Sequence, residues 1–128
     1  MRLLLDTCAF LWLNGDLQQV PQRVRQACES ADNDLYLSAA SVWEIAIKWS
    51  AGRLLLPEEP AVWVPERRQQ NGIESLPVTE DAVAQITKLP ALHRDPFDRI
   101  LICQAITEGL VVVTPDPLIR QYPVRVFW

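Results

Sequence analysis

The chain has 128 residues, of which 49% are hydrophobic and 22% charged, and its formal net charge is −4. This length suits one globular domain, so we expect residues 1–128 to form a single unit. No apolar run approaches the roughly 20 residues of a membrane span, and the apolar N-terminal segment contains Asp6 and lacks a small-residue cleavage site. These features argue against a membrane partner and a signal peptide.

The cysteines bear on the cellular location of the protein, and the net charge bears on whether it binds nucleic acid. Cys8, Cys28 and Cys103 are an odd number without CxxC spacing, which argues against a disulfide framework and a thiolate zinc site, and favours a cytoplasmic location. The negative charge disfavours nucleic acid, because phosphate contacts need cations. However, ten of the twelve basic residues are Arg, the type best suited to forked phosphate contacts. Charge alone therefore does not exclude a nucleic-acid partner.

Short apolar runs alternate with longer amphipathic ones along the whole chain. In chain order they predict a strand at 3–5, helices at 9–13 and 21–30, a strand at 35–37, helices at 41–51 and 60–70, a strand at 73–78, a helix at 79–88, a helix from Asp95-Pro96 to Glu108, a strand at 110–113, a short helix beginning at Asp116-Pro117, and an edge strand at 124–127. Pro65 predicts a kink or a later start for the 60–70 helix. Strands without polar alternation, separated by helices, indicate a three-layer α/β sandwich with a central parallel sheet.

Acidic residues follow the carboxyl ends of the predicted strands. Asp6 ends the run LLLD and Asp116 lies just past LVVVT, the two most apolar and hence most central strands. Glu44 is expected in the first turn of the helix after strand 35–37, and Asp98 in the first turn of the helix before strand 110–113. Open parallel sheets bind ligands beyond the carboxyl ends of their strands, near the point where strand order reverses. We therefore expect these four acids to share one pocket.

Helix capping is the competing explanation for most of these acids. Asp95-Pro96 and Asp116-Pro117 each fit a cap followed by proline at the first helical position, and Asp6 also precedes a helix. Capping does not require that all of them project from one edge of a sheet. It also leaves Glu44 unexplained, since a Glu within the apolar run VWEIAI needs compensation, for which Lys48 at i+4 is a candidate.

Carboxylates gathered in one pocket predict a bound cation. They repel one another, and a hard divalent ion is the usual resolution. Oxygen-only ligands select Mg²⁺, with Mn²⁺ as a possible substitute. Such an ion can activate a water and neutralise charge on a transferring phosphoryl group. We therefore expect phosphodiester hydrolysis, with Asp6, Glu44, Asp98 and Asp116 as catalytic and metal-binding residues.

Four segments carry a family resemblance: LLLDTCAFLWL at 3–13, LYLSAASVWEIAIKWSAGRL at 35–54, HRDPFDRILICQA at 93–105 and LVVVTPD at 110–116. In these motifs the chain resembles the PIN-domain ribonucleases, specifically the VapC-type toxins of type II toxin–antitoxin pairs. The resemblance implies that Asp6, Glu44, Asp98 and Asp116 are the family's four acids, in that order.

The same resemblance implies supporting residues, a substrate and partners. Thr7 and Thr114 would support the acids, and Asp95 would cap its helix or orient water. The resemblance implies a Mg²⁺-dependent endoribonuclease that cleaves structured RNA such as tRNA or rRNA, forms a homodimer, and is silenced by a cognate antitoxin. Asp6, Asp98 and Asp116 would hold the metal, and Glu44 would be a ligand through water or a proton acceptor.

Two competing functions remain open at this stage. One is a catalytically weak PIN module that only binds RNA or a protein, which Asp6→Asn would separate from an enzyme. The other is a phospho-acceptor receiver domain, which requires a Lys at the carboxyl end of a late strand. Lys48 and Lys88 are the only lysines and both lie in or at the end of predicted helices. This pattern disfavours a receiver domain.

The remaining polar and aromatic residues of interest have less specific patterns. His93 is the only His, and a lone His in a charged loop predicts a solvated residue rather than a catalytic one. Arg94 and Arg99 flank the acids and could hold RNA phosphate, or they could pair internally with Asp95 or Glu108. Five tryptophans are present, and any that is exposed would suit an antitoxin groove.

Overall fold

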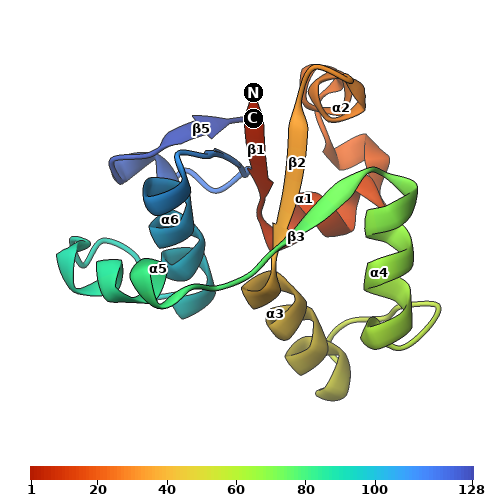
Figure 1. The fold of residues 1–128 in the computed structure, drawn as a ribbon. Coiled ribbons are helices and arrows are strands. Elements are labelled where there is room, and N and C mark those ends of the chain that lie inside the picture. Colours follow the sequence, from red (N-terminus) through yellow and green to blue (C-terminus); the bar gives the residue numbers. More distant parts are fainter.

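The computed structural model describes all residues, 1–128, and its centre is a five-stranded parallel sheet (Figure 1). The strands are β1 (Arg2–Leu5), β2 (Asp34–Ser38), β3 (Ile73–Leu76), β4 (Val111–Val113) and β5 (Arg125–Phe127), in the spatial order β3-β2-β1-β4-β5. Every neighbouring pair is parallel. Leu3–Leu5 and Val111–Val113 are entirely buried, as expected for apolar strands covered on both faces.

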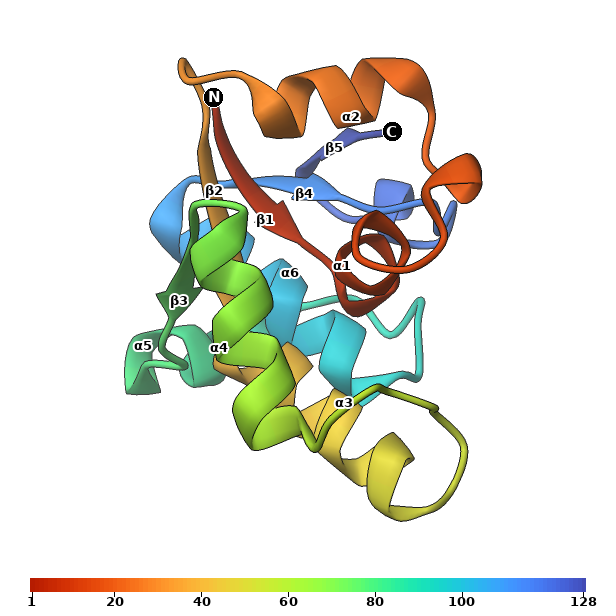
Figure 2. The same cartoon turned by 90° about the vertical axis from the view of Figure 1, so that its right-hand side faces the viewer.

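Helices cover both faces of this sheet. They are α1 (Thr7–Leu13), α2 (Gln22–Glu29), α3 (Ala39–Ser50), α4 (Pro60–Gln70), α5 (Glu80–Ala84) and α6 (Pro96–Glu108), with 3-10 turns at Leu17–Gln19, Gln85–Lys88 and Ile119–Gln121. Figures 1 and 2 show α1, α2 and α4 on one side of the sheet and α6 on the other. The predicted three-layer α/β sandwich is confirmed.

Two separate apolar clusters hold the three layers together. On one face, Leu3 and Leu5 of the central strand pack with Phe10 of α1 and Trp63 of α4. On the other face, Leu4 belongs to a cluster that includes residues of α6 and β4. Alternate residues of β1 thus enter opposite cores, which is the direct consequence of the two-residue period of a strand. Every residue of this strand after Arg2 is fixed by packing on one side or the other.

Several element boundaries differ from those predicted. Helix α3 begins at Ala39 because Ser38 caps it by accepting the Ala40 N–H at 3.0 Å, so Glu44 lies in the second turn rather than the first. No helix begins at Asp116-Pro117, since Asp116 accepts the Leu118 N–H in a turn and the 3-10 segment starts at Ile119. The predicted helix at 79–88 is divided into α5 and a 3-10 turn, whereas α4 continues through Pro65. No helix of the chain has both the length and the apolar character needed to cross a membrane.

The order of the strands in the sheet reverses between the two neighbouring strands β1 and β4. The chain leaves β1 toward β2 on one side, and later crosses to β4 on the other side. The Asp6 N–H donates to the Val113 carbonyl at 3.0 Å, so the two strands end together. The segments that follow them diverge, and Asp6 and Asp116 lie in those segments. A ligand-binding cleft is expected at this position of an open α/β sheet.

Candidate functional site

A pocket of about 390 Å³ opens where the segments after β1 and β4 diverge, and all four predicted acids line it. They come from four parts of the chain: the end of β1, the second turn of α3, the first turn of α6 and the loop after β4. The full lining is Asp6, Thr7, Cys8, Leu11, Trp12, Glu44, Lys48, Asp95, Asp98, Pro115 and Asp116. The convergence that the strand-end pattern predicted is therefore present in the fold.

Asp6 is the most buried of these acids, with 4% of its surface exposed. Its Oδ1 accepts the Ala9 N–H at 2.7 Å and caps α1, so this residue both caps a helix and faces the pocket. Burial raises the pKa of Asp6 to about 7, and the charges of Asp98 and Glu44 act in the same direction. Without a compensating cation, ionisation of this carboxyl is therefore costly near neutral pH.

Glu44 lies at the pocket wall with both carboxylate oxygens already bound. The Thr7 hydroxyl donates to Oε1 at 2.6 Å, and the Lys48 ammonium donates to Oε2 at 2.7 Å. The residue is 7% exposed, so these two donors supply the compensation that an acid in an apolar helix requires. Lys48 is the i+4 partner considered from the sequence, and its hydrogen bond to Glu44 raises the pKa of this lysine.

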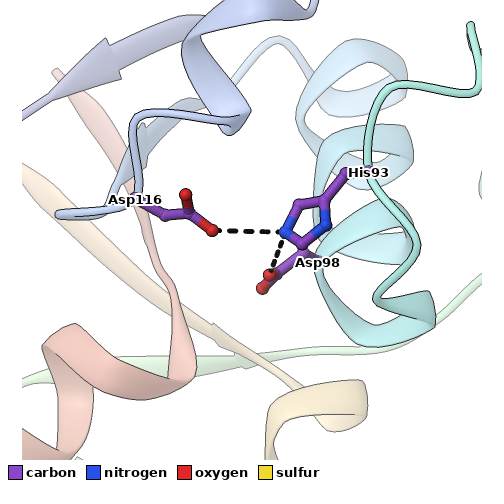
Figure 3. Close-up of side chains that lie close together, drawn as sticks. All are labelled: His93, Asp98 and Asp116. Atoms are coloured by element: carbon purple, nitrogen blue, oxygen red, sulfur yellow. Dashed lines mark hydrogen bonds and ion pairs between the residues drawn. The ribbon is translucent and has the colours of Figure 1, made fainter.

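Asp98 and Asp116 are joined by a residue that sequence reasoning assigned to solvent. His93 Nε2 lies 2.8 Å from Oδ2 of Asp98 and 3.2 Å from Oδ2 of Asp116 (Figure 3). Its side chain is only 13% exposed, so the expectation of a solvated loop residue was wrong. Burial raises the pKa of Asp98 to about 6, the charge of Asp95 adds to this effect, and His93 opposes it.

The position of His93 follows from the turn that starts α6. Asp95 accepts the N–H groups of Phe97 and Asp98 at 2.9 and 3.3 Å and so caps the helix. Capping was one of the two roles expected for this residue. The residues just before this cap lie over the helix N-terminus, where Asp98 also sits. In the sequence, the position of His93 two residues before the Asp95-Pro96 cap was the one sign that its side chain could lie near Asp98. Nothing in the sequence indicated its contact with Asp116.

Comparison with known proteins identifies the family of this chain. The model of the PIN domain family matches residues 3–124. The chain belongs to the PIN domain family. Ribonuclease VapC22 of Mycobacterium tuberculosis is 28% identical over 93% of this chain and 90% of its own length, and ribonuclease VapC16 of the same organism is 43% identical over 42% of this chain and 38% of its own. The resemblance to VapC-type PIN domains that the sequence motifs indicated is confirmed.

Solved structures agree with this assignment at the level of the fold. The VapBC2 structure of Rickettsia felis, bound to a DNA fragment from its promoter, superposes with a TM-score of 0.72 at 13% identity, covering 99% of this chain and 98% of that one. The DNA-bound VapBC structure of Salmonella typhimurium gives a TM-score of 0.68 at 22% identity, over 99% and 97% of the two chains. The three-layer architecture of this PIN domain is thus shared with VapBC complexes.

The donor set of this PIN domain suits a hard divalent ion. The acids offer only oxygen, the type of ligand that Mg²⁺ and Mn²⁺ prefer. Burial disfavours the ionised forms of Asp6 and Asp98, and a bound cation would offset that cost. Carboxylate oxygens of Asp98 and Asp116, from two different elements, lie within 4.8 Å of each other. The residues therefore fit a cation at the end of the sheet.

The two arginines beside the acids have different surroundings in this PIN domain. Arg99 donates to the carbonyls of Pro90, His93 and Ile86 at 3.2 to 3.5 Å, and pairs with neither Asp95 nor Glu108. These hydrogen bonds attach the segment before α6 to the helix and occupy the Arg99 guanidinium. Arg94 is exposed and makes no ion pair, so its guanidinium is free to contact an anion. Of the two, only Arg94 remains a candidate for phosphate binding.

Proposed function

We propose that this PIN domain is a divalent-metal-dependent endoribonuclease and the toxin of a VapBC-type toxin–antitoxin pair. The observation that carries the proposal is the convergence of Asp6, Glu44, Asp98 and Asp116 from four separate segments into one pocket. Helix capping explains Asp6 locally, but it does not require the four acids to meet. The similarity to a protein named as a ribonuclease, over 93% of this chain, supports the same activity.

Asp6, Asp98 and Asp116 would hold the cation, which we propose to be Mg²⁺, with Mn²⁺ as a substitute. When bound, such an ion supplies a polarised phosphate oxygen and an activated water for hydrolysis of the phosphodiester. Because Asp6 is only 4% exposed, it would contact the ion from the protein side of the pocket. Glu44 has both oxygens engaged by Thr7 and Lys48, so we assign it contact with the reacting groups through a water rather than directly.

We propose structured RNA, such as tRNA or rRNA, as the substrate. A second cavity of about 390 Å³ adjoins the acidic pocket and shares Glu44, Lys48 and Asp95 with it. Arg53 and Arg94 also line this cavity, and both are exposed. Guanidinium groups beside an acidic pocket suit phosphates that flank a scissile bond. RNA would therefore approach from the side of α3 and the loop before α6.

The proposed partners are a cognate antitoxin and a second copy of this chain. Helix α3 carries exposed apolar side chains: Trp43 at 64% and Ile47 at 44% exposure share one face, and Trp49 at 38% lies near the end of the helix. Trp43 packs edge-on against Phe97, with ring centroids 5.1 Å apart, so this surface continues onto α6. Exposed aromatic groups of this kind are frequent anchors of protein interfaces. A toxin of this type would act in the cytoplasm.

The test of the proposed function is a map of RNA 5′ ends after induced expression in cells. Wild type should generate new 5′ ends at defined positions, and Asp116→Asn should generate none. Asp32→Asn, which removes the same charge from an exposed turn, is the matched control and should behave as wild type. Identical 5′ ends with wild type and Asp116→Asn would overturn the nuclease. Growth inhibition by both without cleavage would support the alternative, a PIN module that only binds RNA or protein.

A further inference from the structure

His93 is held in place by its backbone as well as by its side chain. Its N–H donates to the Tyr122 hydroxyl at 2.8 Å, and its carbonyl accepts from Arg99 at 3.3 Å. Tyr122 is 3% exposed, so the residue that anchors this loop belongs to the core. The backbone contacts therefore hold the imidazole beside Asp98 and Asp116. A solvated loop residue would have no such attachment.

The hydrogen-bond pattern assigns the tautomer of the ring. Nδ1 accepts the backbone N–H of Asp95 at 3.4 Å, which leaves Nδ1 without a proton. The proton of the neutral ring is then on Nε2, which lies within hydrogen-bond distance of Oδ2 of both Asp98 and Asp116 (Figure 3). His93 thus acts as a donor shared by two carboxylates. A metal-ligating His has the opposite arrangement, with its second nitrogen donating to an acceptor.

The two carboxylates that share this donor belong to different elements. Asp98 lies in the first turn of α6, and Asp116 lies in the loop after β4. Their negative charges repel, so a common donor is required to keep them side by side when no cation is present. Asp116 Oδ1 also accepts the Leu118 N–H at 2.9 Å, which fixes this carboxylate at both oxygens. Asp98 Oδ1 has no hydrogen-bond partner and is available to a ligand.

We propose that His93 is a positioning residue that arranges Asp98 and Asp116 for the divalent ion through its Nε2–H and does not bind the ion itself. This inference rests on the metal site of the proposed function and adds a residue to it. Partners that orient ligating carboxylates are needed for affinity, and their loss typically costs 10- to 100-fold in metal binding. His93 would accordingly determine how tightly the site holds its ion, although it lies outside the set of acids.

Because His93 is the only histidine, labelling with ¹⁵N-histidine gives a single imidazole to observe by NMR. We expect the Nε2–H form in the metal-free full-length chain and the same form after addition of Mg²⁺ to saturation. Loss of the Nε2 proton on Mg²⁺ binding would identify His93 as a ligand and overturn the proposal. Release of the ring to a tautomer mixture on Mg²⁺ binding would show that the ring merely occupies the ion's place, and would also overturn it.

Calorimetric titration with Mg²⁺ and Mn²⁺ provides the second readout. His93→Leu should weaken binding of both ions by about 10- to 100-fold. His93→Gln, which can place an amide N–H near the former Nε2, should recover most of that loss. Tighter binding by His93→Leu, or unchanged binding, would overturn the proposal while leaving the proposed function intact. Failure of wild type to bind either ion would overturn the metal requirement of the proposed function and this inference with it. If His93→Leu does not fold, the NMR result on wild type decides.

Discussion

The Thr7 hydroxyl lies 2.6 Å from Oε1 of Glu44 and joins α1 to α3 at the acidic pocket. Both residues are buried, and Lys48 binds the other oxygen of the same carboxylate from the solvent side. Thr7 therefore provides the only donor that Glu44 has on the protein side of the pocket. Since a buried carboxylate oxygen without a donor is costly, this hydroxyl contributes to the stability of the fold as well as to the site.

Replacement of Thr7 by valine keeps the shape of the side chain and removes the donor. We expect Thr7→Val to lower the free energy of unfolding by about 1–3 kcal/mol, measured by urea denaturation. Thr107→Val is the matched control, because Thr107 is an exposed residue of α6 and makes no side-chain hydrogen bond. Equal losses in the two variants would show that the Thr7–Glu44 contact does not stabilise the protein.

The stability of the metal-free protein should fall as the pH rises from 5 to 8. Burial raises the pKa of Asp6 to about 7 and that of Asp98 to about 6, above the value of 3.8 expected for an unfolded chain. A folded pKa above the unfolded one gives stability that is present below pH 4 and is lost as pH rises through 6 to 7. In EDTA, urea denaturation should show a decrease on the order of 2–4 kcal/mol.

Two comparisons identify the carboxyls responsible for this pH dependence. Asp6→Asn should make the profile shallower and leave only the contribution of Asp98, because the more buried group no longer has to ionise. Adding Mg²⁺ or Mn²⁺ to the wild-type protein at pH 8 should raise its free energy of unfolding again, since an ion that binds the folded state stabilises it by mass action. A stability that rises with pH over this range in EDTA would contradict the raised pKa values of Asp6 and Asp98.

Much of this fold could be predicted from local sequence. Leu3–Leu5 and Val111–Val113 have no polar residue, so their burial in the middle of a parallel sheet follows directly. The carboxyl ends of such strands meet at one edge of the sheet, which is why the sequence alone could place Asp6 and Asp116 in a common pocket. Glu44 was recognised because an acid in an apolar helix needs a compensating partner.

The errors arose where distant residues decide the local structure. The position of His93 depends on Tyr122, which lies 29 residues later in the chain, and no local pattern encodes that contact. Arg99 satisfies backbone carbonyls of a loop instead of pairing with an acid, because the loop folds back over α6. Glu44 lies one turn later in its helix than predicted, since Ser38 both ends β2 and caps α3.

The dual location of Asp95, in the pocket lining and at the helix cap, can be resolved by substitution. Asn retains a capping oxygen but removes the charge, whereas Ala removes both. We expect Asp95→Ala to cost about 0.5–2 kcal/mol of stability in thermal or urea unfolding, and Asp95→Asn to cost much less. Binding of Mg²⁺ should change little in Asp95→Asn. A large loss of Mg²⁺ affinity in that variant would place Asp95 among the metal ligands rather than at the cap alone.

The cavity beside the acidic pocket should contribute to RNA affinity through charge. Arg53 and Arg94 line it, are exposed and make no ion pair, so each is available to one phosphate. Binding of single-stranded RNA can be measured by fluorescence anisotropy in an Asp116→Asn background, which under the proposed function should not cleave the RNA. Replacing both arginines by Gln should weaken binding and reduce the slope of log K against log[salt] by about 0.7 per lost phosphate contact. Arg23→Gln is the control and should keep the full slope, because Arg23 is an exposed residue of α2 that lines neither this cavity nor the acidic pocket. A salt dependence unchanged by the double substitution would show that RNA does not cross this cavity, and would direct the search for its path to another side of the pocket.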